Sequence, residues 1–528
     1  MQFYGRVINR LRIFQSASTT VSMRRPVTGK WVAPARKQAS FSGDGQPTFL
    51  NQTGKLENPA DWHAPDASRL WLYNLHYFDD LNARAAQKRR SLHCDLVQRW
   101  IDENPPFHGT GWEPYPCSLR IVNWSKWALA GNKLESDWQE SLALQAAWLI
   151  KSIEWHLLGN HLFANAKALV FAGLFFEGKD ARRWLGKGLD ILEREIPEQI
   201  LAGGGHFERS PMYHAIVTED ILDLINATQA WPGVVSAEDA ENWRSVARRM
   251  LSWTALMRHP DGKIALFNDS AFGIAPDPGE LFEYANRLSI DFSLPSGPIQ
   301  YFDASGYVRS DIGDAVLFAD VGEIGPDYLP GHAHADTLSF ELSLFGDRWF
   351  VDTGCSTYEV CDERLRQRGT AAHNTVIVDN ENSSEVWSSF RVARRAKPMH
   401  VSTQLRSAKA VISAAHDGYK RLKGKVIHHR CFELSDSKLE IKDRLDGRYA
   451  TADANFLLHP DIEVLQTAEA IVMRRGERVA RLCVDGGRPE ILDSTWHPEF
   501  GLSIPAKRIK VSFMQPTLTT TITWRKSE

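Results

Sequence analysis

Apolar residues recur with two different periods along the chain. From about residue 60 to residue 295 they return every three or four positions, which is the period of an amphipathic helix. Glycine and proline residues separate these segments, as at Pro232-Gly233. Many helices of similar length joined by short turns predict an α/α toroid, with a globular helical bundle as the alternative. The clearest segments are residues 136–158, 162–176, 181–200, 211–231 and 237–258.

From about residue 300 the pattern becomes that of strands, with short segments rich in apolar and β-branched residues. Turn signals such as Phe345-Gly346-Asp347 and Asp485-Gly486-Gly487 stand between them. This half of the chain predicts a large antiparallel β-sandwich. The predicted strands include residues 307–310, 315–319, 338–344, 349–351, 375–378 and 439–442, and residues 508–524 are rich in Thr, Val and Ile.

The change of period divides the chain into an arm and two domains. The 528 residues exceed what one hydrophobic core usually serves. We therefore expect an α+β multidomain protein, with an N-terminal α/α toroid (an incomplete barrel) over residues 59–299. A C-terminal antiparallel β-sandwich follows over residues 300–528. Residues 1–58 show weak periodicity and basic patches, and we expect them to form a partly irregular N-terminal arm.

The composition and charge indicate an ordinary globular protein. Apolar residues make up 43% of the chain and charged residues 24%, as in ordinary globular proteins. The formal net charge of −3 gives no electrostatic reason to expect a nucleic-acid partner. No apolar segment is long enough to span a bilayer as a transmembrane segment, and the N-terminus shows no continuous apolar stretch of an export signal. From the residues alone we therefore expect a cytoplasmic protein.

Two histidines and a carboxylate alternate within residues 331–336. Strand side chains repeat every second residue, so this alternation predicts His332, His334 and Asp336 on one face of an extended strand. Histidine titrates near neutrality and is also the commonest metal ligand. We expect the chemistry at this segment, where His332 could point toward a substrate.

A further carboxylate and a third imidazole follow in later segments. Asp352 and His373, together with His334, form a donor set expected for a zinc site folded from a sheet. The alternative is a buried polar network without a metal. In the zinc-site interpretation, Asp336 and Asn374 would orient the zinc ligands or have a structural role.

A glycine run at residues 203–205 precedes a predicted helix start. Ser210 followed by Pro211 is typical of an N-cap and the first helical position. Tyr213 and His214 then fall in the first turn, where the positive end of the helix dipole favours anions. The alternative is that Tyr213 packs in the core. The functional candidates of this loop are Glu208, Arg209, Tyr213 and His214.

Two more segments carry candidate residues, each with an ordinary alternative. Asn160 and His161 begin a predicted helix, where Asn160 could serve only as the N-cap. Trp112 and Arg120 would suit a sugar-binding cleft, because an indole packs on sugar rings and a guanidinium pairs with carboxylates. They could equally belong to a structured loop and the helix that follows it.

Taken together, these motifs resemble the heparinase II/III-like family of polysaccharide lyases. The resemblance covers roughly residues 60–450 and is most specific in the second half, where several motifs occur in the family's order. It implies an α/α toroid followed by a β-sandwich, in agreement with the change of period. The matching pieces are residues 71–78, the Asn160-His161 pair, residues 210–214, the His332, His334 and Asp336 segment, residues 352–354 and residues 373–376.

The family's chemistry is β-elimination on a uronic-acid-containing glycan. A lyase must neutralise the uronate carboxylate, remove the C5 proton and protonate the leaving O4. By resemblance, Asn160 and His161 would neutralise the carboxylate, which His214 could also touch. Tyr213 would be the base or the acid, with His332 as its partner on the other side.

The resemblance also implies a cofactor, a substrate and a location. His334, Asp352 and His373 would hold a structural zinc ion. The substrate would be an acidic polysaccharide, in capsule or exopolysaccharide metabolism, and the location the periplasm or cell envelope. The candidates for substrate binding are Glu208, Arg209, His214, Trp112 and Arg120.

Two other functions fit the same residues. A glycoside hydrolase on the toroid would need two carboxylates flanking the bond, for which Glu208 and Glu113 are candidates. A non-catalytic glycan-binding protein would keep the cleft without turnover. The joint presence of Asn160, Tyr213 and His332 argues against this last possibility.

Overall fold

The computed structural model describes residues 23–294 and 296–525. The chain divides into two compact units. Unit 1 comprises Met1–Glu198, Glu219–Ser245 and Tyr284–Ser289, and unit 2 comprises Gln199–Thr218, Val246–Glu283 and Ile290–Glu528. Two long helices, α8 (Pro211–Ala230) and α9 (Ala237–Leu256), contribute residues to both units.

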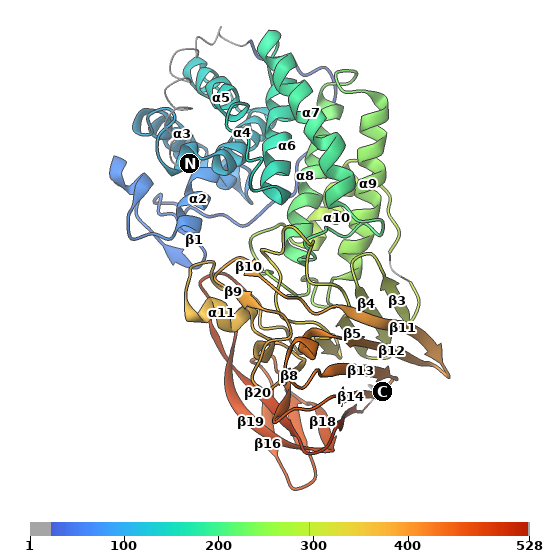
Figure 1. The fold of residues 1–528 in the computed structure, drawn as a ribbon. Coiled ribbons are helices and arrows are strands. Elements are labelled where there is room, and N and C mark those ends of the chain that lie inside the picture. Colours follow the sequence, from blue (N-terminus) through green and yellow to red (C-terminus); the bar gives the residue numbers. More distant parts are fainter. Residues whose placement is uncertain (1–22, 295, 526–528) are drawn as a thin grey trace. The chain divides into compact units, whose positions relative to one another are not determined.

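Unit 1 is mainly helical (Figure 1). Its most buried helix, α6 (Gly159–Phe175), is apolar on nearly all sides, as expected of a core helix, and it packs against α4 (Pro114–Leu129). The other helices that precede the sheets are α2 (Arg69–Tyr77), α3 (Arg90–Glu103), α5 (Ser136–Leu149), α7 (Lys179–Gln199) and α10 (Pro278–Arg287). Short elements are η1 (Pro59–His63), η2 (Asp79–Asn82), η3 (Ala86–Arg89), η4 (Thr110–Trp112), β1 (Thr48–Phe49) and β2 (Gln52–Thr53).

Unit 2 contains three larger antiparallel sheets. The five-stranded sheet follows chain order: β3 (Ile299–Phe302), β4 (Tyr307–Ile312), β5 (Ala315–Asp320), β6 (Phe340–Leu344), β7 (Asp347–Phe350). The four-stranded sheet has the order β19 (Gly487–Trp496), β20 (Ile504–Phe513), β15 (Ala452–Leu457), β8 (Val376–Val378). The eight-stranded sheet has the order β11 (Pro398–Arg406), β12 (Lys409–His416), β13 (Ile427–Leu434), β14 (Lys438–Asp446), β21 (Thr517–Trp524), β18 (Arg478–Asp485), β17 (Ile471–Arg475), β16 (Glu463–Gln466). Shorter elements are α11 (Asp362–Arg368), η5 (Thr370–Ala372), η6 (Gly418–Arg421), β9 (Val386–Trp387) and β10 (Arg391–Val392).

The core of unit 2 lies between these sheets. Alternate residues of β13 are buried, which is the pattern of a strand with one face in a core. The Phe340 ring lies 5.6 Å from the Phe432 ring and 6.1 Å from the Phe456 ring, centroid to centroid. These three residues belong to β6, β13 and β15, one strand from each sheet. Unit 2 is therefore a β-sandwich with a shared aromatic core.

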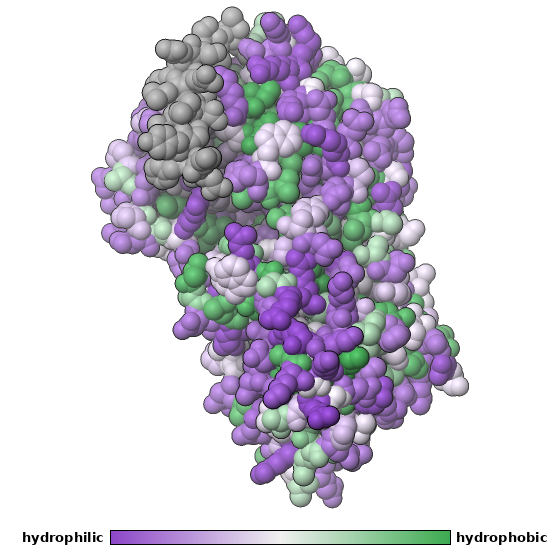
Figure 2. Space-filling view, viewed as in Figure 1, coloured by the Kyte–Doolittle hydropathy of each residue, from purple (hydrophilic) through white to green (hydrophobic). Residues whose placement is uncertain are grey.

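The described surface is mixed in character. The face drawn in Figure 2 is mostly hydrophilic, with hydrophobic residues in small patches. Within residues 23–294 and 296–525, no helix is both long and apolar enough to cross a membrane.

The predicted fold class is confirmed, but two local predictions are wrong. The helix predicted over residues 136–158 ends at Leu149, because the following turns bury Ile153 and Glu154. Residues 331–336 form an irregular connection between β5 and β6 instead of a strand. Their backbone pairs with other loops: the His332 carbonyl accepts from the Asp269 N–H at 3.0 Å.

The domain boundaries stay predictions. Helix α10 ends at Arg287 and β3 begins at Ile299, which brackets the predicted change from helices to strands. Residues 1–22 of the predicted arm lie outside the described residues. Its described part, residues 23–58, includes β1 and β2.

Candidate active site

The start of α8 presents Tyr213. Ser210 caps the helix as predicted, because its Oγ accepts a hydrogen bond from the Tyr213 backbone N–H at 3.2 Å. The same hydroxyl donates to the Asp269 carbonyl at 2.7 Å and lies 3.0 Å from the Ser270 hydroxyl. The first turn of α8 is therefore tied to the loop that carries Asp269.

The ring of Tyr213 packs against the ring of His332. Their centroids lie 4.0 Å apart and their planes differ by 33°. Tyr213 is 9% exposed, and its hydroxyl oxygen lies 3.1 Å from that of Tyr358. The phenol and the imidazole are therefore direct neighbours in unit 2. The expectation that His332 works from the other side of the sugar stays a prediction.

A buried carboxylate, Asp269, organises both histidines of residues 331–336. It accepts hydrogen bonds from Nδ1 of His332 and from Nε2 of His334, each at 2.9 Å. The Arg364 guanidinium donates to both carboxylate oxygens, with Nη2 2.7 Å from Oδ2. Burial alone would raise the pKa of Asp269, but Arg364 and the histidine hydrogen bonds outweigh it and hold the pKa well below its usual value. Asp269 is therefore charged.

This network leaves one nitrogen of His332 free for chemistry. In the neutral imidazole, donation of Nδ1–H to Asp269 leaves the lone pair on Nε2. The Glu208 carboxylate lies 3.8 Å from Nε2. The two loops are also joined by a hydrogen bond from the His334 N–H to Oδ1 of Asn268 at 3.0 Å. An imidazole oriented in this way is suited to act as a general base.

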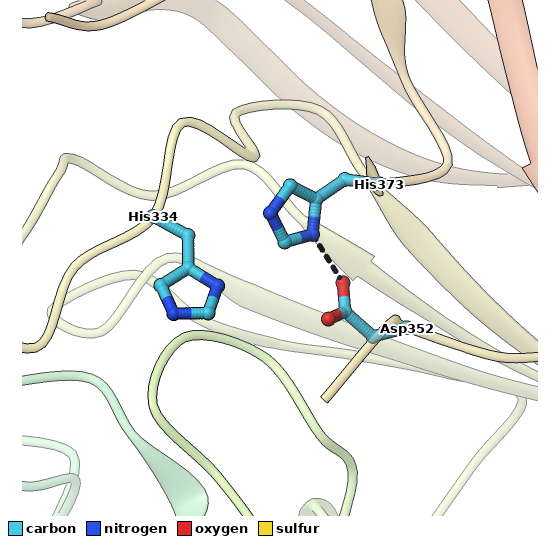
Figure 3. A group of neighbouring side chains, drawn as sticks. All are labelled: His334, Asp352 and His373. Atoms are coloured by element: carbon cyan, nitrogen blue, oxygen red, sulfur yellow. Dashed lines mark hydrogen bonds and ion pairs between the residues drawn. The ribbon is translucent and has the colours of Figure 1, made fainter. Parts of the chain in front are cut away.

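A second cluster joins His334 to Asp352 and His373 (Figure 3). One possible ligand atom from each residue lies within 4.8 Å of the other two, and all three residues are buried. Nδ1 of His373 donates to Oδ2 of Asp352 at 2.8 Å. Nδ1 of His334 and Nε2 of His373 have no hydrogen-bond partner among the described residues. Burial lowers the pKa of His334 to about 3, so its ring is neutral, as a metal ligand must be.

Buried polar groups surround this cluster. Glu341 accepts the Asp352 N–H at 2.9 Å through one oxygen and contacts Nε2 of His259 at 2.5 Å through the other. Neither carboxylate oxygen of Asp336 has a hydrogen-bond partner within residues 23–294 and 296–525, and burial raises its pKa to about 6. The Asn374 amide donates to two backbone carbonyls at 2.7 and 3.0 Å, which is a structural role.

Two family models match most of the chain. The family model described as Heparinase II/III-like, C-terminal, matches residues 294–525, and that described as Heparinase II/III N-terminus matches residues 90–275. The chain belongs to the heparinase II/III-like family. The resemblance seen in the sequence motifs is therefore confirmed.

The curated relatives of this heparinase II/III-like chain are heparin-sulfate lyases. The one from Bacteroides stercoris is 28% identical over 251 residues, which are 44% of this chain and 37% of the relative. The one from Bacteroides thetaiotaomicron is 26% identical over 336 residues, 54% of this chain and 48% of the relative. The chain thus spans less than half the length of each of these two relatives.

Solved structures share the fold of this heparinase II/III-like chain. Heparinase III aligns with a TM-score of 0.72 at 19% identity, over 91% of this chain and 81% of that one. A mutant of the heparan sulfate lyase HepC from Pedobacter heparinus aligns with a TM-score of 0.62 at 16% identity, over 93% of this chain and 86% of that one. These similarities confirm the predicted toroid followed by a β-sandwich.

Three residues predicted to bind substrate are core residues in this family member. His214 packs on Trp253 with ring centroids 4.2 Å apart, and its Nε2 lies 2.9 Å from the Thr254 hydroxyl. In unit 1, the buried Arg120 stacks over Trp100 at 3.8 Å. Trp112 is also buried, with Nε1 donating to a backbone carbonyl at 3.3 Å. All three side chains are buried, and each has a polar atom bonded to a protein atom. Substrate binding by His214, Arg120 and Trp112 stays a prediction.

The other two substrate-binding candidates, Glu208 and Arg209, are neighbours in the sequence, and Glu208 lies near His332 in space. Glu208 is buried with its carboxylate toward Nε2 of His332. Arg209 adopts a left-handed backbone conformation with φ of 57°, and its carbonyl accepts a hydrogen bond from the Tyr307 hydroxyl at 2.7 Å. Its guanidinium contacts Glu323. Substrate binding by Glu208 and Arg209 stays a prediction.

Asn160 and His161 lie at the start of α6 in unit 1. The N-cap of this helix is Leu158, so the interpretation of Asn160 as the cap is wrong. Asn160 is buried, whereas His161 is partly exposed. Nδ1 of His161 lies 3.2 Å from Glu154, and its ring lies 4.4 Å from the Tyr115 ring. Their catalytic roles stay predictions.

Sequence analysis missed three residues of the site: Asp269, Tyr358 and Arg364. Asp269 stands two residues after an apolar run at residues 264–267, with Asn268 between them, so this pair of polar residues is a usable signal. Tyr358 and Arg364 lie in or near a short charged helix with no motif of its own. Only folding brings Arg364 to Asp269.

Proposed function

We propose that this protein is a polysaccharide lyase that cleaves a uronic-acid-containing glycan by β-elimination. The Tyr213–His332 contact carries the proposal, because a phenol and an oriented imidazole lie together. In the reaction the C5–H bond breaks, and its electron pair forms the C4=C5 double bond. The C4–O4 bond breaks, and O4 leaves with a proton. The reaction therefore needs an acceptor for the C5 proton and a donor of a proton to O4.

In this proposal His332 accepts the C5 proton at Nε2, and the Tyr213 hydroxyl donates to O4. The charged Asp269 stabilises the imidazolium that forms. Tyr358, hydrogen-bonded to the Tyr213 hydroxyl, stabilises the phenolate left after proton donation. Positioned acid–base groups of this kind typically contribute about 10²- to 10⁴-fold in rate.

The common side of the two groups favours one uronate configuration. Because the rings touch, both act on one face of the sugar, which is a syn elimination. In a glucuronate ring the C5–H and C4–O4 bonds project from the same face, whereas in an iduronate ring they project from opposite faces. We therefore infer a preference for glucuronate-type residues.

His334, Asp352 and His373 would hold a structural zinc ion. The fit rests on three buried donors within 4.8 Å and on imidazole nitrogens that lack partners among the described residues. When bound, the ion would supply a fixed positive charge that joins three separate segments. His334 shares Asp269 with His332, so ordering His334 also orders the proposed base.

The proposed substrate is an acidic polysaccharide, because the curated relatives are heparin-sulfate lyases. Heparan sulfate is the first candidate, and bacterial capsule or exopolysaccharides are the second. A place in the periplasm or cell envelope fits such a substrate. Asn160 and His161 keep their predicted role of neutralising the uronate carboxylate.

The test is a screen of uronate polysaccharides with the full-length protein, followed by ultraviolet absorbance. Elimination produces a C4=C5 double bond conjugated to the carboxylate, which absorbs, whereas hydrolysis produces only new reducing ends. The hydrolase alternative is weaker because Glu113 is engaged by Tyr73 and Arg69. Reducing ends without new absorbance would overturn the lyase proposal, and absence of any product across the panel would overturn it as well.

A further inference from the structure

The short hairpin β9–β10 carries an exposed aromatic ring beside an exposed cation. Trp387 pairs directly with Arg391 across the two antiparallel strands, so both side chains lie on one face of the hairpin. Trp387 is 55% exposed, and Arg391 is exposed as well. An indole next to a guanidinium is suited to an acidic sugar, because the ring packs on the pyranose and the cation pairs with its carboxylate or sulfate.

Neither side chain is used by the rest of the protein. Among the residues that the structure describes, the Trp387 indole has no hydrogen bond or ring contact and the Arg391 guanidinium has no ion pair. The neighbouring Arg394, by contrast, donates to the Glu385 carboxylate at 2.8 Å. A surface arginine without a carboxylate partner keeps its full charge for a ligand.

The hairpin is rigidly attached to the candidate active site. Arg364, which binds Asp269, also donates to the Ser389 carbonyl at 3.1 and 2.9 Å. Arg368 donates to the Ser388 carbonyl at 3.0 Å. Both arginines belong to α11, which lies beside β9 (Figure 1). A loop that is already ordered loses less conformational entropy when a ligand binds to it.

The tip of the hairpin reaches the proposed catalytic pair. The Phe390 ring lies 5.7 Å from the His332 ring and 5.1 Å from the Tyr358 ring, centroid to centroid. Trp387 is three residues from Phe390, at the far side of a three-residue turn. A ligand on Trp387 is therefore next to the reacting position and not on it.

We propose that Trp387 and Arg391 form a subsite for an acidic sugar residue that neighbours the one cleaved. This inference rests on the proposed lyase function and adds how the glycan is held. Trp387 packs on the pyranose face, and Arg391 pairs with its carboxylate or sulfate. Both contacts exist before and during the reaction, so they contribute to binding without changing the chemical step.

The test compares Trp387→Ala and Arg391→Ala with the unaltered full-length protein on heparan sulfate, or on whichever polysaccharide of the panel it cleaves. Each variant should raise KM about tenfold while kcat stays within about twofold, which corresponds to the loss of one good contact. Trp387→Phe and Arg391→Lys should recover part of the loss. Arg391→Ala should also weaken the dependence of KM on salt. The matched controls are Leu465→Ala and Arg481→Ala, which remove exposed side chains of β16 and β18.

A binding measurement separates this inference from the proposed function. A labelled heparan sulfate hexasaccharide is titrated into Tyr213→Phe, alone and combined with each hairpin variant. Loss of binding in the combined variants supports the subsite even where no polysaccharide is cleaved. An unchanged KM in both hairpin variants would overturn the subsite inference. So would a Tyr213→Phe protein that does not bind the hexasaccharide, or whose binding is unaffected by the hairpin variants.

Discussion

The rings of Tyr213 and His332 are in contact, with centroids 4.0 Å apart, although one residue lies in the first turn of a helix and the other in a loop between strands. Both belong to unit 2, so the contact is formed within one compact body. Ser210 ties the helix start to Asp269, and Asp269 holds the imidazole. The proposed acid and base are thus positioned by one short network.

Tyr213→Phe and His332→Ala should each reduce cleavage about 10²- to 10⁴-fold, because each removes one proton-transfer group. Initial rates by ultraviolet absorbance measure the loss, and circular dichroism checks that the fold survives. Tyr449→Phe, at a hydroxyl distant in sequence from the site, is the matched control and should keep full activity. Near-normal turnover in either active-site variant would refute the assigned roles.

Asp269→Asn should impair both activity and stability. The amide cannot balance the buried Arg364 charge, so the free energy of unfolding should fall by about 3 kcal/mol. The amide also no longer holds His332 in one tautomer, so both the maximum value of kcat and the shape of its pH profile should change. Denaturant titration and rate–pH curves measure the two effects. Asp493→Asn, an exposed aspartate on β19, should alter neither quantity. A pH profile of kcat that is unchanged in Asp269→Asn would contradict the positioning role of Asp269.

His334→Ala should lose bound zinc and stability together, since structural metal binding is coupled to folding. Elemental analysis of the purified protein measures the metal, and thermal unfolding measures the stability. A chelator should lower the Tm of the unaltered protein and leave that of the variant nearly unchanged. His400→Ala, at an exposed histidine of β11, is the control. A variant that retains a stoichiometric ion would contradict the assignment.

His214 should make the protein less stable in acid. Burial lowers its pKa from 6.5 to about 3 in the folded protein. The unfolded chain therefore binds the proton more readily, so the stabilisation is complete above pH 6.5 and falls as pH drops toward 3. Between pH 7 and pH 5 this histidine should account for a loss of about 2 kcal/mol in the free energy of unfolding. Urea titrations at both pH values should show a smaller drop in His214→Gln than in His400→Gln. Equal drops would mean that His214 titrates normally.

Much of the fold follows from local patterns in the sequence. Ser210 and Pro211 mark a helix start because the cap and the missing N–H are satisfied within a few residues. Leu439 and Ile441 alternate with Glu440 and Lys442, which predicts the strand found as β14, because every second side chain shares the buried face. The donors His334, Asp352 and His373 are predictable from residue type and from the family resemblance, because imidazole and carboxylate groups are ordinary zinc ligands.

Other features depend on contacts between distant segments. Trp112, Arg120 and His214 are residue types of a binding cleft, but such amphipathic side chains serve equally well in a core, where each has a polar atom bonded to a protein atom. The strand expected at residues 331–336 is absent because loops, and not a neighbouring strand, supply its backbone partners.

The sequence by itself determined the two classes of domain, the helix start at Pro211 and the donors of the candidate metal site. Only the tertiary structure decided that the rings of Tyr213 and His332 are in contact, that Asp269 and Arg364 orient the imidazole, and which polar residues are buried. The physical reason is range. Periodicity and capping act over a few residues, whereas burial and charge pairing depend on segments that meet only after the chain has folded.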